Sequence, residues 1–592
     1  MGRVRAQSVF ALLILTTVVL FLPGCRRQPT GESVEGTVMD TAGKPVAGVR
    51  VFNSGDGPKL IETRTDLLGR FRLLGIASGP LYVFAEKAGY RFTGTRATAE
   101  AKNVAIQLMS QAEPPAQWPA GSKPMPLGQQ RKLARGMLEK LWAEDSRSKR
   151  CSGVAGAMSR IDPELALRWA AELGPDNRDL VRASVAQEIA DKDLDEAFGL
   201  IGQSGVWGLN ILSRLARRYA VSDHAKAMRC AEELALRGRA VDQPWRAAYL
   251  AEAGRVVIQA GNKNAGWKLL DEAGGMAAKF GSGLAYVFPR GIVARAMAPT
   301  DLKRALALWE PASLGAVADR FLGNVAMAIC LERLDAALQI AAKLKSPYAA
   351  DHTRLRIAYR LAPTRPTDAI RVAEALPAGP YFASWTSPRA MALGWVAAAI
   401  APHDKPLACS VLDRAIASLT VSDGLKLPNG APGGWPACAG FLAVQAEQIG
   451  YPDMESIVYR ALACRPMKNK GYGSNIALPV LWSETFMAGL LSLVDRQVAT
   501  DLLESIDVQA RMVGLSPHAV ARPAWLKAWC LVDAKRGQAL FDEAFAAVKN
   551  KPGADNDFYQ LVEAASLLAA PPEEKPQHIL NTPEFRCPYE DE

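Results

Sequence analysis

Hydrophobic residues follow two different periods along this chain. Between residues 33 and 110, apolar and polar positions alternate, as in the stretch 104–108, and glycine, aspartate or proline interrupts the alternation about every ten residues. A period of two broken by turn residues is typical of short β-strands joined by tight connections. We therefore predict a small antiparallel β-sandwich over residues 33–110, with Gly43 and Gly69 closing two of its turns.

From residue 128 to residue 570 the period becomes helical, with apolar residues at i, i+3 and i+4. Similar phrases rich in small residues end successive segments at 215–220, 293–298 and 357–362, and a second amphipathic segment follows each of them. The breaks recur roughly every 30 to 40 residues, which is the length of a helix-pair repeat. We predict a large all-α helical-repeat domain over residues 128–570, an α-solenoid that resembles tetratricopeptide repeats.

Stacking explains why such repeats occur in series. One helix pair cannot bury its apolar side alone, so neighbouring pairs must cover it, and the stack is expected to form an elongated, open superhelix. Polar residues at the breaks are expected to accept hydrogen bonds from free N–H groups where the second helices begin. The candidates for this capping role are Ser222, Thr300, Asp368 and Asp404.

The first domain resembles a known family. The motifs that carry the resemblance are GTVMDTAGKPVAGVRV at residues 36–51, TDLLGRFRL at 65–73 and KAGY at 87–90. They resemble the carboxypeptidase regulatory-like domain, a transthyretin-like β-sandwich that is grouped with carbohydrate-binding-like folds. The resemblance implies a non-catalytic accessory domain. The associated zinc peptidase would require His-x-x-Glu, and no histidine of this chain has glutamate three residues later.

Composition changes mark the segments around these domains. Prolines concentrate in residues 111–127, which predicts an extended, semi-rigid linker. Residues 571–592 follow the helical pattern and are predicted to form a polar C-terminal tail.

The N-terminus has the layout of a bacterial lipoprotein signal peptide. Basic residues precede an apolar run over residues 9–22, and Cys25 follows shortly after it. We predict that residues 1–24 are removed, that Cys25 receives lipid, and that residues 25–32 form a tether to the membrane. The run is too short to prefer a membrane span, and an uncleaved N-terminal anchor is the alternative. In both cases the body is predicted to be exported and to face the periplasm or the cell surface, with the outer membrane favoured.

Charge does not point to a nucleic-acid partner. The formal net charge is +10 over 592 residues, and basic residues are interspersed with acidic ones. A nucleic-acid-binding surface requires a clustered basic stripe. We therefore expect no nucleic-acid partner.

Motifs for catalysis and metal binding are absent from the sequence. It contains no phosphate-binding loop, no zinc-protease motif, no serine-nucleophile elbow and no pair of cysteines in CxxC spacing. Acidic pairs such as Glu232 and Glu233 lie among basic residues and are interpreted as solvated helix surface. We predict a protein that is not an enzyme, with no catalytic residues, no metal ligands and no cofactor.

Two glycine-rich insertions, at residues 423–435 and 469–475, interrupt the helical pattern. Long loops inside a compact domain are often functional, and aromatic side chains in a concave site bind sugars or peptides. The alternative, which we favour, is that these loops are irregular connections whose aromatic side chains fill the core. The candidate ligand-binding residues are Trp435, Tyr472, Trp482 and Glu484.

Two classes of function fit this organisation. The favoured one is a non-catalytic, lipid-anchored cell-envelope protein that acts as a binding or assembly scaffold for a protein or a polysaccharide, because solenoids present extended concave faces. The alternative is a carbohydrate-active enzyme with an α/α-toroid, either a glycoside hydrolase or a polysaccharide lyase. Closure of the helical domain into a ring distinguishes the two classes. A toroid brings its first and last helix pairs together and lines its centre with Asp, Glu, Tyr and Trp, whereas an open superhelix keeps its ends apart.

Overall fold

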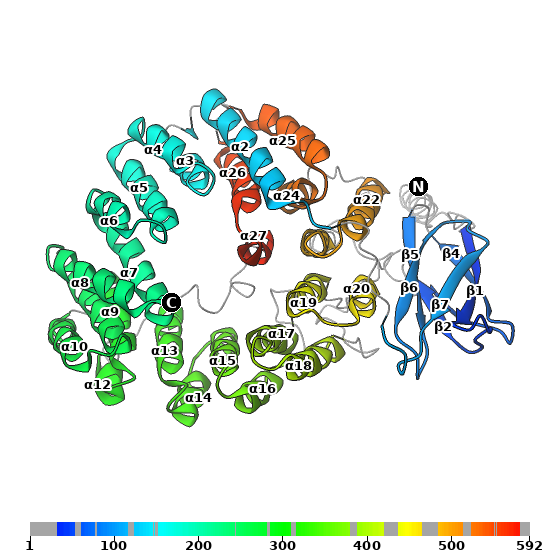
Figure 1. Cartoon of the computed structure of the whole chain (residues 1–592), viewed down its shortest axis with the longest axis horizontal. Coiled ribbons are helices and arrows are strands. Elements are labelled where there is room, and N and C mark those ends of the chain that lie inside the picture. Colours follow the sequence, from blue (N-terminus) through cyan, green and yellow to red (C-terminus); the bar gives the residue numbers. More distant parts are fainter. Residues whose placement is uncertain are drawn as a thin grey trace, which may run out of the picture. The chain divides into compact units, whose positions relative to one another are not determined.

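The chain forms two compact units, a β-sandwich before residue 116 and a helical domain after it (Figure 1). This architecture confirms the predicted fold class. The computed structural model describes residues 32–53, 61–76, 80–115, 123–145, 147–148, 152–242, 244–280, 284–308, 315–378, 387–419, 436–463, 484–512, 522–549, 551 and 553–580.

The β-sandwich contains two sheets, with strand orders β4-β1-β7 and β3-β2-β5-β6. Its described strands are β1 (Glu32–Asp40), β2 (Arg50–Asn53), β3 (Ile61–Arg64), β4 (Arg70–Ile76), β5 (Pro80–Glu86), β6 (Thr93–Thr98) and β7 (Val104–Leu108). All neighbouring strands run antiparallel except β1 and β7, which are parallel, with Val38 opposite Ile106. The antiparallel prediction is therefore wrong for this pair, because local alternation does not reveal the direction of strands that are distant in sequence.

Alternate residues of both sheets form the core of the sandwich. Val34 and Val83, one from each sheet, are fully buried among the other inward-facing aliphatic side chains. Gly43 and Gly69 adopt φ angles of 77° and 71°, as predicted for the ends of two turns. The carboxylate of Asp66 accepts hydrogen bonds from two backbone N–H groups of the second turn. The turn chemistry read from the sequence is confirmed.

The helical domain is built mainly from antiparallel helix pairs. Its described helices are α2 (Leu127–Glu144), α3 (Gly153–Met158), α4 (Pro163–Ala171), α5 (Pro175–Ile189), α6 (Leu194–Gly202), α7 (Gly205–Ser222), α8 (His224–Gly238), α9 (Trp245–Gln259), α10 (Lys263–Ala277), α11 (Leu284–Met297), α12 (Leu302–Ala307), α13 (Gly315–Ile329), α14 (Leu334–Ala342), α15 (Pro347–Leu361), α16 (Pro366–Glu374), α17 (Pro388–Ile400), α18 (Lys405–Ala417), α19 (Pro436–Ile449), α20 (Met454–Ala463), residues 484–491, α22 (Arg496–Met512), α24 (Arg522–Val532), α25 (Ala534–Val548), α26 (Asp555–Ala569) and α27 (Lys575–Leu580), with a short 3₁₀ turn, η2 (Pro572–Glu574).

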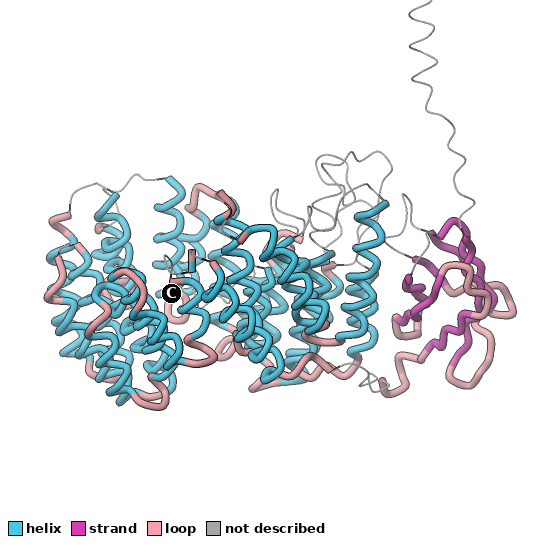
Figure 2. The backbone as a smooth tube through the Cα atoms, turned by 90° about the horizontal axis from the view of Figure 1, so that it is seen from above, coloured by secondary structure: helices cyan, strands magenta, loops and turns pink. Residues whose placement is uncertain are grey.

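The pairs stand side by side in two layers. From α3 to α19 the odd-numbered helices contact one another in an inner layer, and each is followed by an even-numbered partner in an outer layer (Figure 1). Figure 2 shows the helical domain from the side, and its helices run roughly parallel to one another. Most residues of α9, α17 and α19 are buried, because these inner helices are covered by neighbours on several sides. The alternation of a mostly apolar helix with an amphipathic one thus reflects the two layers.

Small residues allow the closest helix contacts. A Cβ atom added to Gly254 in α9 would lie 2.8 Å from the carbonyl oxygen of Gly266 in α10. The reciprocal distance from Gly266 is 2.5 Å. Both distances are too short for a side chain, so this pair of helices packs backbone to backbone.

Aspartate residues cap many of the outer helices. The carboxylate of Asp404 accepts a hydrogen bond from the N–H of Leu407, as predicted. Two other predicted caps are displaced by one position. Asp223 and Asp301 cap α8 and α12, whereas the hydroxyls of Ser222 and Thr300 donate to carbonyl groups of the preceding helices, α7 and α11.

The fourth predicted cap, Asp368, lies inside α16. It forms ion pairs with Arg365 and Arg371 at 2.6 and 3.0 Å. Its carboxylate therefore stabilises the first turn of α16 through side-chain pairs, and the prediction that it caps the helix is wrong.

The helical domain closes on itself. Residues 484–491 pack between α19 and α24, since added Cβ atoms on Gly440 and Gly489 would contact Leu490 and Ala528. The inner layer then continues from α24 through α26 to α3. The open, elongated superhelix expected from the sequence is therefore wrong for this domain.

Helix α2 completes the closure. It packs along α26, in the place that the outer partner holds in the other pairs, so the last pair combines the first and last parts of the helical domain (Figure 1). Arg147, just after α2, is buried, pairs with Asp145 at 2.6 Å and lies over the ring of Phe558 in α26. Glu144 also pairs with Lys549 at 3.0 Å. Apolar packing and polar contacts both hold this seam, defined as the contacts of residues 127–148 with residues 534–569.

Candidate functional site

Most of the residues predicted to bind a ligand lie outside the described part of the chain. These are Trp435, Tyr472 and Trp482, and the same holds for Cys25. Glu484 is described, begins the helical segment 484–491 and is 0% exposed. The pocket proposed around the glycine-rich insertions therefore stays a prediction.

A different site is present on the inner side of the helical domain. A cavity of about 800 Å³ is lined by the inner helices from α3 to α13, and residues of α26 and α27 contribute to its wall. This volume is in the range of pockets that hold small organic ligands. Because α3, α26 and α27 all contribute, the cavity depends on closure of the domain at the seam.

Aromatic side chains line the cavity and remain accessible. Trp207 in α7, Trp245 in α9 and Phe288 in α11 are 44%, 41% and 44% exposed. The ring of Trp245 lies 6.2 Å from that of Tyr249, and the ring of Phe288 lies 5.5 Å from that of Phe321. Large apolar side chains exposed within a concave surface point to ligand contact. All three lie toward the N-terminal ends of helices that run in the same direction, so they share one end of the cavity.

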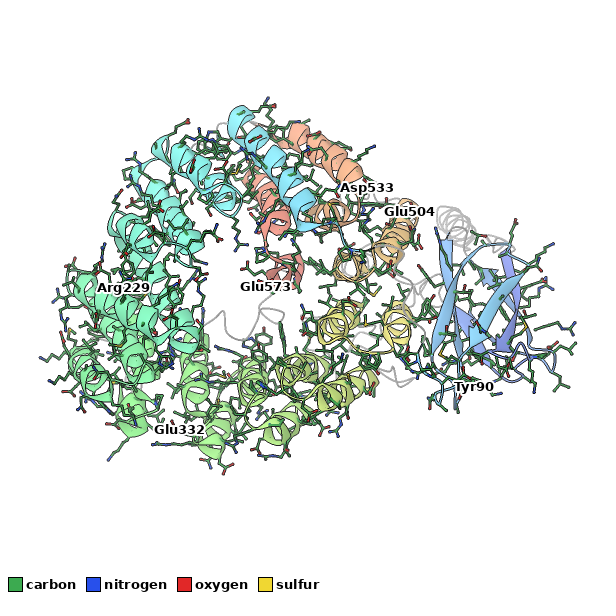
Figure 3. All side chains as sticks on the ribbon, in the orientation of Figure 1. Tyr90, Arg229, Glu332, Glu504, Asp533 and Glu573 are labelled. Carbon is green, nitrogen blue, oxygen red and sulfur yellow. The ribbon has the colours of Figure 1, made fainter. Side chains whose placement is uncertain are left out.

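The cavity carries an excess of positive charge. Its lining includes five arginines, Arg160, Arg214, Arg217, Arg295 and Arg320, but only two glutamates, Glu188 and Glu252. Residues outside the cavity also carry charge, such as Arg229 in α8 and Glu332 in the turn after α13 (Figure 3), but there acidic and basic residues alternate. The excess of positive charge in the cavity therefore comes from the residues that line it, most of which lie on the inner helices.

Glu252 anchors one side of the cavity. It is only 4% exposed, it accepts a hydrogen bond from Arg295 of α11, and it pairs with Arg255 at 3.2 Å. Burial alone would raise the pKa of Glu252, but the charges of Arg295, Arg255 and Arg217 outweigh it and lower its pKa to about 2. One carboxylate thus faces three arginines and neutralises only part of their charge.

The opposite wall is more nearly balanced. Arg160 pairs with Glu574 at 2.8 Å and with Glu188 at 3.7 Å, and it lies 3.4 Å from the Nε2 atom of His578. Burial, and secondarily the charge of Glu574, raises the pKa of Glu188, while Arg160 opposes this shift. Lys575 holds α27 in place by donating to two carbonyl groups at the end of α26. This wall is therefore built from paired charges.

Polar side chains between the two walls are also held by hydrogen bonds. The hydroxyl of Tyr249 donates to the side-chain oxygen of Asn210 at 3.0 Å, and burial raises the pKa of Tyr249 to about 12. The phenol is therefore protonated at neutral pH.

Within the described ranges, no group of three or more His, Cys, Asp and Glu side chains is placed to hold a metal ion. None of the helices that the structure describes is both long and apolar enough to cross a membrane.

A signal for this site was present in the sequence. Arg217 and Arg295 occupy the third position of the phrases 215–220 and 293–298, which we interpreted only as the ends of repeated helical segments. The two phrases repeat at equivalent positions of the repeat, so their arginines lie on the same inner surface. A search for charged residues at equivalent repeat positions would have found this pair.

Replacing Glu252 tests the buried charge network. We expect Glu252→Gln to lower the free energy of unfolding by roughly 3 kcal/mol at pH 7, because it leaves Arg295 and Arg255 without their buried partner. The pKa of Glu252 in the folded protein lies below its usual value, so its stabilising contribution is present above about pH 4.5 and is lost as the pH falls toward 2. The difference between wild type and variant should therefore shrink over that range, as measured by urea unfolding followed by circular dichroism.

Glu272→Gln is the matched control, since Glu272 pairs with Arg239 at 2.9 Å on the exposed side of α10. This variant should unfold close to the wild type at every pH. Equal losses for the two variants, or a difference for Glu252→Gln that does not change with pH, would contradict the assigned network.

Comparison with known proteins identifies the first domain. A solved structure described as "Circular tandem repeat protein with novel repeat topology and enhanced subunit contact surfaces" aligns with 76% of this chain and 98% of its own length at 13% identity, with a TM-score of 0.16. That score is too low to support an argument about the helical domain. A search of curated proteins gives no match. Residues 33–108 match the carboxypeptidase regulatory-like domain family, so the β-sandwich is a carboxypeptidase regulatory-like domain, as the sequence motifs predict.

Proposed function

We propose that this protein is a non-catalytic, lipid-anchored protein of the bacterial cell envelope that binds a polysaccharide in the cavity of its helical domain. The observation that carries this proposal is the set of three accessible aromatic side chains, Trp207, Trp245 and Phe288, inside one concave site. Aromatic faces present a flat apolar surface on which the C–H face of a sugar ring packs. The carboxypeptidase regulatory-like domain, with its carbohydrate-binding-like fold, supports the same ligand class.

The alternative is a carbohydrate-active enzyme, and closure of the helical domain is the observation that favours it. A ring of helix pairs is the arrangement expected for an α/α-toroid. The lining of the cavity favours binding, because arginines outnumber carboxylates there. The general acid of a glycoside hydrolase is a protonated carboxylic acid. Glu252, with a pKa of about 2 and two arginine partners, does not meet this requirement. Glu188, whose pKa burial raises, is the lining carboxyl group that the enzymatic alternative would use.

Binding is tested with the exported part of the chain, residues 25–592, on an array of neutral and acidic glycans. We expect at least one glycan class to bind, and the variants Trp207→Ala and Trp245→Ala to weaken that binding about tenfold each, because each removes an aromatic contact. Isothermal titration with the bound glycan measures the change. Incubation of the same glycan with the protein, followed by product analysis, tests for cleavage.

Tyr559→Ala is the control for loss of an aromatic side chain. Tyr559 is 48% exposed on α26 and does not line the cavity, so its replacement should leave glycan binding unchanged. Failure of every glycan to bind, or equal effects of the three variants, would refute the proposed site. Cleavage of the glycan would replace binding with the enzymatic alternative.

The lipid anchor is tested in the cell that makes the protein. Inhibition of signal peptidase II should leave a heavier precursor that retains residues 1–24, because cleavage before Cys25 is the step that such an inhibitor blocks. Membrane fractions are analysed by immunoblotting and mass spectrometry. A protein whose mass does not change and whose N-terminus begins at Met1 would support the uncleaved anchor instead.

A further inference from the structure

We infer that the polysaccharide bound in this cavity is acidic and that Arg214 and Arg320 bind its anionic groups. This inference rests on the proposed function and specifies the class of ligand. It is drawn from the charges of the cavity and from which of them have partners.

The arginines of the cavity differ in how their charge is used. Arg295 is buried and hydrogen-bonded to Glu252, and Arg160 is paired with Glu574 and Glu188. These two therefore belong to the internal structure of the walls. Their guanidinium groups are already paired with neighbouring carboxylates, so they are poorly placed to bind a ligand.

Arg214 and Arg320 have a different environment. Both line the cavity and both are exposed, and the described residues offer neither of them an ion-pair partner. A guanidinium group binds carboxylates and sulfate or phosphate esters through two parallel hydrogen bonds. An anionic group of the ligand is the natural partner for each of them.

The shape of the site strengthens the effect of these charges. Low-dielectric walls around a cavity concentrate the electric field of the charges that line it. Arg217 lies on the same wall, and its charge also acts on Glu252. A neutral ligand would leave the repulsion among these arginines in place, whereas an anionic ligand relieves it.

The order of the helices matches an acidic sugar chain. Arg214 lies on α7 and Arg320 on α13, and the helices between them, α9 and α11, carry Trp245 and Phe288. Consecutive inner helices are in contact along this series. The wall thus presents one cation, two aromatic rings and a second cation. A chain of sugar rings with anionic groups at intervals can contact all four.

The test compares ligands of different charge, two of which share one skeleton. The probes are an oligogalacturonate tetramer, its fully methyl-esterified form, a heparin-derived tetrasaccharide and neutral cellotetraose, titrated into the protein comprising residues 25–592. We expect an acidic probe to bind, its uncharged counterpart to bind at least tenfold more weakly, and the affinity for the acidic probe to fall as sodium chloride is raised from about 0.05 to 0.5 M. Binding of the oligogalacturonate would show that carboxylates suffice, whereas binding of the heparin tetrasaccharide alone would show that sulfate groups are required.

Variants locate the charges that matter. Arg214→Gln and Arg320→Gln should each weaken binding of the acidic probe about tenfold and make it less dependent on salt, while Arg214→Lys and Arg320→Lys should retain part of the affinity. Both side chains are exposed, so the variants should fold, and circular dichroism checks this. The control is Arg229→Gln, on the outer helix α8, where the arginine pairs with Asp195 (Figure 3).

Each outcome has a distinct meaning. Stronger binding of cellotetraose or of the methyl ester would overturn this inference while leaving the polysaccharide-binding function in place. Unchanged binding by both glutamine variants would also overturn it. Binding by no glycan at all would refute the proposed function itself.

Discussion

The packing of α2 along α26 is the contact on which the helical domain depends. Every helix pair has two sides that a neighbouring pair must cover, and a linear stack leaves one side uncovered at each end. Here the last inner helix, α26, takes its partner from the beginning of the domain. This arrangement covers both ends at once, because neither α2 nor α26 forms a complete pair without the other.

Closure also determines where the cavity lies. The inner helices turn their small and apolar residues toward one another, and residues that face the middle of the ring are not part of the core. Beside the seam, Arg160 from the start of the domain pairs with Glu574 from its end at 2.8 Å. Glu573, beside α27, lies toward the middle of the ring (Figure 3). The seam is therefore both a structural contact and one wall of the candidate site.

The electrostatics of the cavity follow from repetition. Inner helices that share a sequence phrase place similar side chains at similar heights, so a basic residue kept in several repeats builds a cluster of like charge. Glu252 stabilises part of this cluster, and its two oxygens are occupied by Arg295 and Arg255. Arg214 and Arg320 lie outside this network and are the residues proposed to bind a ligand, so the same wall contributes to the stability of the inner layer and to the proposed function.

The sequence was informative where local chemistry determines the structure. Alternation predicted the sandwich, the glycine turns at Gly43 and Gly69 have the expected backbone angles, and the phrase at 357–362 ends a helix in the inner layer. Long-range relations were not accessible. The parallel pairing of β1 with β7 joins segments far apart in sequence, and closure depends on small rotations between pairs that accumulate around the ring.

The candidate site could be predicted only in part for the same reason. Trp207, Trp245 and Phe288 lie at unrelated positions in sequence and share a site only because α7, α9 and α11 stand side by side.

The helix caps show the same limit of sequence-based prediction on a smaller scale. Asp223 and Asp301 cap the helices next to the predicted Ser222 and Thr300, because a one-residue shift brings a carboxylate to the extended backbone position at the helix start.

Distance measurement across the seam tests the account most directly. Spin labels are placed at Glu144→Cys and Lys549→Cys, whose native side chains pair at 3.0 Å, in a protein whose other accessible cysteines are replaced by serine. Surface pairs of this kind contribute little to stability, so the substitutions should preserve the fold. Dipolar broadening of the continuous-wave EPR spectrum, which reports spin–spin distances as short as this one, should give one short, narrow distance distribution if the helical domain is closed. A long, broad distribution, as an open superhelix would produce, would contradict closure and with it the cavity on which the proposed function rests.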